Sequence, residues 1–343
     1  MISPVHFIIF IPLLFFSFKL SAQRNAESIN RSYPDTSVYN AGTPYELWFA
    51  KPKPFMWIKN YIPDNKEFFK ATVTKKGLIT LGVVAASTTA MIFYDQTILD
   101  ETQRFGRKIG IPGDNKQVAI IDFSFNYKGD EIPLPVYVPA NLNTAMYFLG
   151  DGLFHIGLVG GIWGYGKINH DNRAKQTASQ MVEAMLGAGM MIQVIKHITG
   201  RESPFTADTR GGVWRFFPNQ LEYARNVPNY DAFPTGHLAA TLAALTVVSE
   251  NYPEKRWIKP VGIGLCTMLG FSMVNNGVHW ISDYPLGMVI GYGFAKIAVR
   301  KGRISPPVFA DKIPGSMESS KKKVQLFPLM NPVNKTAGVI LSF

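Results

Sequence analysis

Residues 272–283 read SMVNNGVHWISD, a polar turn between two apolar runs of helical length. The runs on either side of it, 258–274 and 283–299, contain few of the β-branched alternations that would indicate strands. Further apolar stretches lie upstream, at 77–94, 144–166, 180–195 and 237–248. The sequence therefore predicts an all-α fold, with a six-helix bundle over residues 77–300.

Two more segments place polar residues at the ends of predicted helices. Residues 196–204, KHITGRESP, end the third apolar run, and residues 233–237, FPTGH, open the fourth. If consecutive helices run antiparallel, these two segments and the turn at 272–283 lie at the same end of the bundle. The pattern predicts that they converge on one site.

The residue types in these segments favour chemistry on a phosphate group. His279 and Asp283 are four residues apart and share a face if they lie on a helix, where the carboxylate fixes the imidazole tautomer and raises its basicity. His237 follows Pro-Thr-Gly at a helix N-terminus, where backbone N–H groups bind anions and an imidazole can protonate a leaving group. Lys196 supplies a positive charge. Together these groups indicate phosphoryl transfer through a phosphohistidine.

The three segments resemble the motifs of the type 2 phosphatidic acid phosphatase and vanadium haloperoxidase superfamily. The first motif of that family is Lys, six residues, then Arg-Pro, and this chain has Lys196, six residues, then Ser203-Pro204. The second is Pro-Ser-Gly-His, seen here as residues 234–237, Pro-Thr-Gly-His. The third is Ser-Arg, five residues, His, three residues, Asp, seen here from Ser272-Met273 to Asp283.

The resemblance implies a role for each matching residue. His279 would be the nucleophile, Asp283 its orienting partner and His237 the general acid. The residues expected to hold the phosphate are Lys196, Thr235, Gly236, Ser203, Ser272 and Arg201, the last as a replacement for missing arginines. The family's phosphate-binding arginines are Ser203 and Met273 here, and each lost charge-assisted contact costs about 1.5–3 kcal/mol.

The expected activity is that of a metal-independent phosphatase acting on a phosphomonoester or pyrophosphate, with no cofactor and no metal. Phosphatidate or an isoprenyl pyrophosphate is the favoured substrate class, and a small phosphate ester comes next. Because the two arginines are missing, a catalytically silent member that binds a lipid or phosphate is the alternative. The vanadate-dependent activity of the haloperoxidases in that superfamily would need the same arginines, so we expect no such activity here.

Composition bears on partners and compartment. The net charge of +11 suits an anionic partner, but no basic run longer than 321–323 stands out, so we expect no nucleic acid to bind. The single cysteine, Cys266, excludes an intrachain disulfide framework. The apolar run 5–20, followed by Ser21-Ala22, predicts a signal peptide or an uncleaved anchor.

The predicted organisation has four parts. Residues 1–22 are the signal or anchor, 23–76 an extension that packs on the main domain, 77–300 the helical domain, and 301–343 a tail with a C-terminal β-hairpin. We expect an exported, membrane-associated or periplasmic protein of the cell envelope, with its site facing the exported side. Glycine pairs at 157/161 and 287/291 have the spacing that lets helices approach closely.

Overall fold

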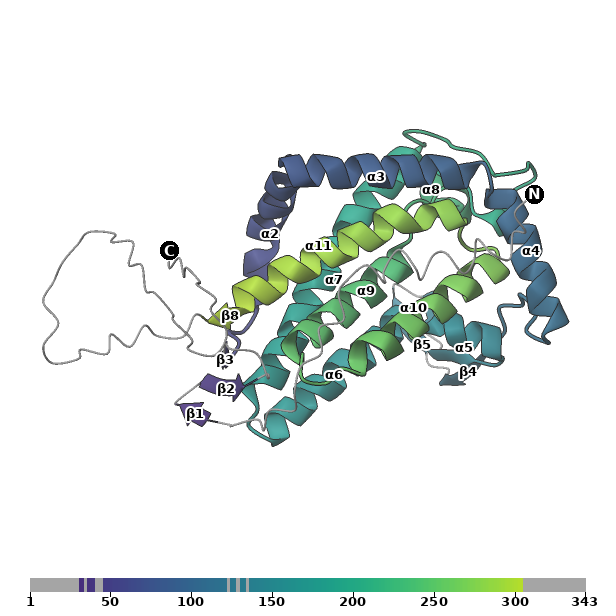
Figure 1. Ribbon diagram of the computed structural model, residues 1–343. Coiled ribbons are helices and arrows are strands. Elements are labelled where there is room, and N and C mark those ends of the chain that lie inside the picture. Colours follow the sequence, from purple (N-terminus) through teal and green to yellow (C-terminus); the bar gives the residue numbers. More distant parts are fainter. Residues whose placement is uncertain are drawn as a thin grey trace, which may run out of the picture. The chain divides into compact units, whose positions relative to one another are not determined.

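The computed structural model describes residues 31–33, 36–40, 46–121, 124–127, 130–133 and 136–304, and Figure 1 labels most of its elements. The α-helices are α2 Met56–Thr72, α3 Lys75–Ile92, α4 Asp95–Lys108, α5 Leu142–Phe148, α6 Gly152–Ile168, α7 Asn172–Thr199, α8 Gln220–Arg225, α9 Gly236–Asn251, α10 Ile258–Asn275 and α11 Tyr284–Gly302. Short 3₁₀ helices are η1 Pro204–Thr206, η2 Val227–Asn229 and η3 Ile281–Asp283. The strands are β1 Arg31–Tyr33, β2 Thr36–Asn40, β3 Glu46–Ala50, β4 Gln117–Ile121, β5 Ser124–Tyr127, β6 Asp130–Pro133, β7 Val136–Pro139 and β8 Arg303–Ile304.

The core forms where α7, α9 and α11 pack together. Its buried side chains include Met181 and Ile192 of α7, Val247 of α9 and Phe294 of α11. Alanines fill the positions between them, because small side chains let the three helix backbones approach one another. The all-α prediction is confirmed, since helices build this core and the strands are short and antiparallel.

The glycine pairs behave differently from each other. A Cβ added at Gly291 would lie 2.1 Å from the carbonyl oxygen of Ala239, and one at Gly287 would lie 2.5 Å from that of Thr235. Close approach of α11 to α9 therefore requires glycine at both positions. The expectation was wrong for Gly157 and Gly161, because a Cβ at either would meet nothing within 4 Å.

The segment before residue 77 packs on the bundle through strands and a helix. β1, β2, β3 and β8 form one antiparallel sheet, in which Val38 of β2 faces Trp48 of β3 and Trp48 faces Ile304 of β8. The following α2 lies against α7, and Phe68 stacks on Phe294 with ring centroids 4.6 Å apart. The extension thus contributes to the core as well as covering it.

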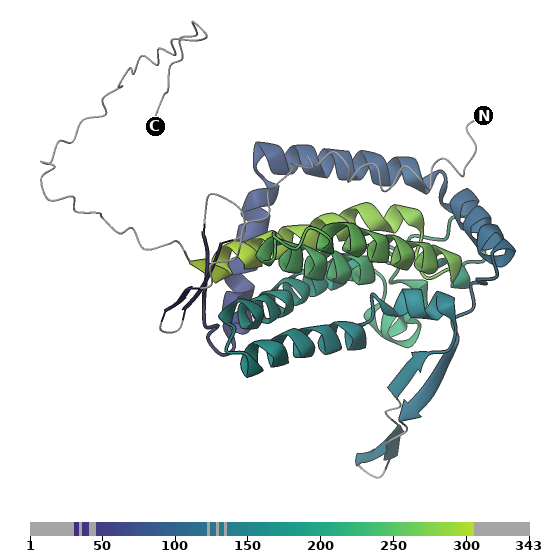
Figure 2. The ribbon, with the colours of Figure 1, turned by 60° about the horizontal axis from the view of Figure 1, so that its bottom comes forward.

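The segment 95–143 contains structure that the sequence analysis did not predict. α4 follows α3 after a bend of 67° and carries charged residues on its exposed side. After α4, the paired strands β4–β7 and β5–β6 form a ribbon that Figure 2 shows standing away from the helices. The sequence predicted one helix over 144–166, but the structure has two, α5 and α6. The Asp151 side chain caps α6 by accepting a hydrogen bond from the Leu153 N–H.

Membrane-length helices occur in the described part of the chain. α7 and α10 are long and apolar enough to cross a membrane, and up to four spans result if α3 with α4 and α5 with α6 each count as one bent span. This finding is compatible with membrane association. The predicted signal or anchor at 1–22 and the predicted β-hairpin beyond residue 304 lie outside the described residues.

Candidate active site

Hydrogen bonds to backbone carbonyls bring the three polar segments together at one end of the bundle. The Thr199 hydroxyl, at the end of α7, donates to the carbonyl of Phe233, just before α9. The Thr235 N–H donates to the Asp283 carbonyl over 3.1 Å, which joins the start of α9 to the start of α11. In Figure 1, α4 and α5 lie at this same end. The segments that the sequence predicted to meet are therefore in contact.

His279 is almost fully buried, and its ring orientation is fixed. Nδ1 lies 2.7 Å from the Ala232 carbonyl oxygen and 3.4 Å from Oδ2 of Asp283. A carbonyl only accepts hydrogen bonds, so Nδ1 carries the hydrogen and Nε2 of the neutral ring keeps its lone pair. This is the tautomer that a nucleophilic histidine needs.

Asp283 contacts His279, but the backbone between them is not the helix that the sequence predicted. The two residues do not share a helix face, because His279 precedes η3 and Asp283 ends it, one residue before α11. The turn itself is held by Asp283, whose Oδ2 accepts the Trp280 N–H at 2.8 Å. The carboxylate and the imidazole thus meet across a tight turn.

His237 faces His279 from the first turn of α9. The ring centroids of the two histidines are 6.0 Å apart, and the ring of Tyr147 lies 4.8 Å from His237 on another side. Burial lowers the pKa of His237 to about 3, with further lowering by His279, Lys196 and His155. His237 is therefore neutral at pH 7 in the unliganded site.

Lys196, for which the sequence predicted a phosphate-binding role, lies in the last turn of α7. Its side chain is 7% exposed, and its ammonium lies 3.2 Å from Oδ2 of Asp231. An anion that enters the site must therefore compete with Asp231 for this charge. Asp231 was not singled out from the sequence, where it is one of several polar residues in a long loop.

Thr235 and Gly236 open α9. The Thr235 hydroxyl caps the helix at the Leu238 N–H and lies 3.6 Å from the sulfur of Met273, which is fully buried. A Cβ added at Gly236 would come within 4 Å only of an Ile192 methyl group, at 3.7 Å, so this position is open. Backbone N–H groups in the first turn of α9 are the natural donors for an anion here.

Arg201 has a role that the sequence did not indicate. Its side chain is fully buried, with Nη1 2.5 Å from Oδ1 of Asp283 and Nη2 2.5 Å from Oδ2 of Asp95. The rings of Trp214 and Trp280 lie 4.6 and 5.4 Å from its guanidinium carbon. Its expected role as a phosphate ligand remains a prediction; its Nε, unlike its two Nη atoms, has no hydrogen-bond partner among the described residues.

The two serines expected at the site are buried, and their expected role in phosphate binding remains a prediction. Ser203 is buried, and its N–H donates to the Pro228 carbonyl. The Ser272 hydroxyl donates to the Asn143 carbonyl over 2.6 Å and so fastens α10 to α5. Among the described residues, no group of three or more His, Cys, Asp or Glu side chains is arranged to hold a metal ion.

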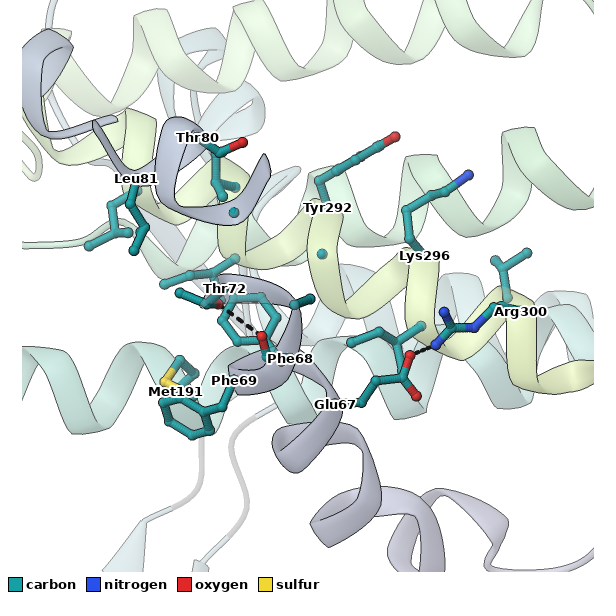
Figure 3. Close-up of a pocket in the computed structure, with 18 of the residues that line it drawn as sticks. Glu67, Phe68, Phe69, Thr72, Thr80, Leu81, Met191, Tyr292, Lys296 and Arg300 are labelled. Carbon is teal, nitrogen blue, oxygen red and sulfur yellow. Dashed lines mark hydrogen bonds and ion pairs between the residues drawn. The ribbon is translucent and has the colours of Figure 1, made fainter. Parts of the chain in front are cut away.

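An apolar groove of about 1020 Å³ runs between α2, α3, α7 and α11 (Figure 3). Ile195 and Ile198 line it, on either side of Lys196 in α7, and Leu286 lines it three residues after Asp283. Charged side chains gather towards the far end of α11, where Arg300 pairs with Glu67 in Figure 3. The lining of the groove therefore extends from Leu286, near the start of α11, to Arg300, near its end.

The comparisons with known proteins concern the second half of the chain. The sequence model of the PAP2 superfamily matches residues 177–304, which span most of α7 through β8. The matched region contains Lys196, His237, His279 and Asp283, while Asp95 lies outside it. Neither a curated protein nor a solved structure matches the chain.

Proposed function

Because this chain belongs to the PAP2 superfamily through residues 177–304, and is on that ground a phosphatase-type protein, we propose that it hydrolyses phosphate esters through a phosphohistidine at His279. The observation that carries the proposal is the hydrogen bond from His279 Nδ1 to the Ala232 carbonyl, with Asp283 behind it and His237 opposite. This arrangement leaves Nε2 as the reactive atom and puts a second imidazole across from it.

In the first step, the Nε2 lone pair attacks phosphorus and the bond from phosphorus to the leaving oxygen breaks. The leaving oxygen takes a proton from His237, which must be protonated beforehand. Since the pKa of unliganded His237 is about 3, the negative charge of the bound phosphate has to raise it, as an adjacent opposite charge does. In the second step, water gives a proton to His237 while its oxygen attacks phosphorus, and the P–N bond breaks.

The phosphate charge is held in this proposal by Lys196 and by the backbone N–H of Gly236, because the Thr235 N–H already donates to the Asp283 carbonyl. Lys196 must leave Asp231 to do so, which weakens substrate binding. The buried Met273 occupies the position of the arginine in the third motif of the superfamily. We therefore propose an enzyme of low affinity, and we keep as second candidate a silent family member that binds phosphate or lipid at the same place.

The substrate class that we favour is a lipid phosphate or an isoprenyl pyrophosphate. Support comes from the groove of Figure 3, which is lined by apolar side chains such as Phe68, Met191 and Ile290 and reaches Ile195 and Ile198 in the last turns of α7. A hydrocarbon chain attached to a phosphate in the site has an apolar surface to lie on there. A small phosphate ester would use the site without the groove.

The compartment that we propose is the cell envelope, with the site on the exported side. The run 5–20 favours export, and basic residues next to the α6–α7 turn and in the α9–α10 loop, namely Lys167, Lys175, Lys255 and Arg256, lie at the end of the helices away from the site. A cysteine introduced at Leu221, an exposed residue of α8, tests this orientation. Labelling of this cysteine by a membrane-impermeant maleimide in intact cells supports it, and labelling only after lysis contradicts it.

The test of the function is phosphate release by the purified protein from phosphatidate, an isoprenyl pyrophosphate and an aryl phosphate, with EDTA present. His279→Ala is expected to abolish release. The matched control is His170→Asn, at an exposed histidine before α7 whose positive φ of 52° asparagine tolerates. Release that is equal in wild type and His279→Ala, or absent from both with retained phosphate binding, overturns hydrolysis and favours the silent binder.

A further inference from the structure

A buried charge network lies directly behind Asp283. The Arg201 guanidinium bridges the carboxylates of Asp95 and Asp283, and its Nη1 also donates to the Ser282 hydroxyl over 2.6 Å. The side chains of Arg201, Asp95 and Asp283 all have 0% exposure. An interaction among fully buried charges is screened little by solvent, so it acts strongly on its neighbours.

Asp95 is placed there by the corner between α3 and α4. It is the first residue of α4, where a carboxylate is favoured by the helix dipole. Its Oδ1 accepts the Ser282 N–H at 3.1 Å, and its Oδ2 accepts the Ser282 hydroxyl at 2.6 Å. Both oxygens of Asp95 are thus fixed on η3, the turn that carries Asp283.

We propose that Asp95 and Arg201 are positioning residues that act on His279 through Asp283. This inference rests on the phosphohydrolase function proposed above. Arg201 holds Oδ1 of Asp283, which leaves Oδ2 to the Trp280 N–H and to Nδ1 of His279. Asp95 holds Arg201 in place and supplies a second negative charge. A segment outside the matched region 177–304 therefore completes the site.

The charge balance gives this network an effect on chemistry as well as on geometry. When both carboxylates are ionised, Asp95, Arg201 and Asp283 together carry one net negative charge, which favours positive charge on His279; burial raises the pKa of Asp95, and the Arg201 guanidinium opposes that rise. The other titratable groups around His279 and His237 include Tyr147, His155, Tyr284 and the ion pair of Lys196 with Asp231. Removal of the Asp95 charge leaves Arg201 and Asp283 neutral as a pair, so the imidazolium of His279 loses its balancing charge.

The decisive variant is Asp95→Asn, which keeps the size of the side chain and removes its charge. In the full-length protein, the His279 imidazole is titrated by NMR, using the resonance that His279→Gln lacks. The pKa of His279 is expected to fall by about one unit, from the loss of a unit charge at short range in a medium of low polarity. The same fall is expected in the pH at which kcat declines on the acid side, with little change in KM.

Two controls separate charge from packing. Asp100→Asn removes a half-exposed carboxylate of the same helix, paired at 3.9 Å with Arg210, and is expected to leave the His279 titration unchanged. Ser282→Ala removes the hydroxyl that joins Asp95 to Arg201 but keeps every charge, and it too is expected to leave the pKa of His279 close to wild type. If the network had a purely structural role, Ser282→Ala and Asp95→Asn should have the same effect on the titration of His279.

The outcomes distinguish this inference from the function it rests on. If the wild type releases phosphate and folded Asp95→Asn has an unchanged His279 pKa and kcat, the network is not a positioning device and the function stands. If the wild type releases none, the function fails, and the NMR titration still decides whether Asp95 acts on His279. Should Asp95→Asn not fold, Asp95→Glu is measured, which keeps the charge but displaces it. A reduced kcat at an unchanged His279 pKa supports the network, and an unchanged kcat overturns it.

Discussion

Asp231 neutralises Lys196 inside the candidate active site. The ammonium and the carboxylate are 3.2 Å apart, and the Lys196 side chain is largely buried while Asp231 is more open to solvent. Arg215 is also paired with a carboxylate, because its Nη2 lies 3.1 Å from Oε1 of Glu202. The cationic side chains that the site offers to a phosphate are thus already paired with carboxylates. The backbone N–H groups at the N-terminus of α9 are the exception.

The Asp231→Asn variant is expected to bind phosphate more tightly than the wild type. Loss of the competing carboxylate frees Lys196 for the anion, and one charge-assisted hydrogen bond is worth about 1.5–3 kcal/mol, or roughly ten- to a hundredfold in affinity. The measurement is the inhibition constant for inorganic phosphate, together with KM. The control, Asp114→Asn, breaks an exposed pair with Lys116 and should change neither value. Unaltered phosphate binding in Asp231→Asn would show that Lys196 does not contact the anion.

His237 makes the stability of the protein depend on pH. Its pKa is about 3 in the folded protein and near 6.5 when exposed, so the unfolded chain binds a proton that the folded one does not. Stability is therefore lost as the pH falls below 6.5, by about 2 kcal/mol at pH 5 relative to pH 8. His237→Asn should remove this part of the slope, as measured by urea unfolding at both pH values. Equal slopes in the two proteins would contradict the prediction.

Arg173 fastens the N-terminal sheet to the bundle. Its Nη2 lies 2.6 and 2.7 Å from the two oxygens of Glu254, its Nε donates to the Asn251 carbonyl, and its guanidinium lies between the rings of Tyr39 and Tyr252. Arg173→Met is expected to lower the free energy of unfolding by about 3 kcal/mol, because it leaves a carboxylate and a carbonyl without their donor.

The control for Arg173 is an exposed ion pair of similar composition. Arg225 lies 3.5 Å from Glu222 on the surface of α8, and exposed pairs contribute about 0–1 kcal/mol. Arg225→Met should therefore unfold at nearly the same urea concentration as the wild type. An Arg173→Met variant as stable as this control would show that the contacts around Arg173 do not hold the sheet.

The core helices were predictable because their apolar runs are bounded by local signals. Thr235 caps α9, and Tyr284-Pro285 opens α11 within a residue of the predicted start. The spacings of the three motifs also predicted which segments meet. α4 was missed because its charged, amphipathic sequence reads as a polar segment when only apolar runs are sought.

The part of the site that the sequence did not reveal depends on long-range contacts. Arg201 pairs with Asp95 across 106 residues, and no local spacing indicates such a pair. The sequence placed Arg201 beside the phosphate because it lies two residues from Ser203, but the αL turn at Gly200 leads into a fully buried side chain. Similarly, residue spacing joined His279 to Asp283 but predicted a helix where the chain makes a turn.

Gly291→Ala tests the close packing of α11 on α9. The added methyl group would lie 2.1 Å from the Ala239 carbonyl oxygen, a backbone atom that moves only if α9 shifts. We expect a loss of about 1–3 kcal/mol, because overpacking costs more than the gain in helix propensity. Gly264→Ala in α10, where a Cβ meets nothing within 4 Å, should be neutral or slightly stabilising. Thermal unfolding of the two variants makes the comparison, and equal midpoints would contradict the close approach.

Val194→Trp tests whether the groove of Figure 3 receives a hydrocarbon chain. Val194 lines the groove from α7, two residues before Lys196, and is 56% exposed, so an indole there reaches into open space without disturbing the core. Hydrolysis of a long-chain phosphatidate should fall about tenfold in kcat/KM, while that of an aryl phosphate stays as in the wild type, because only the long chain needs the space that the indole fills. The control, Val261→Trp, adds the same ring at a half-exposed position of α10 outside this groove and should leave both substrates unaffected. An equal loss for long and short substrates would place the effect of Val194→Trp on the catalytic groups, and no loss for either would show that the substrate chain lies elsewhere.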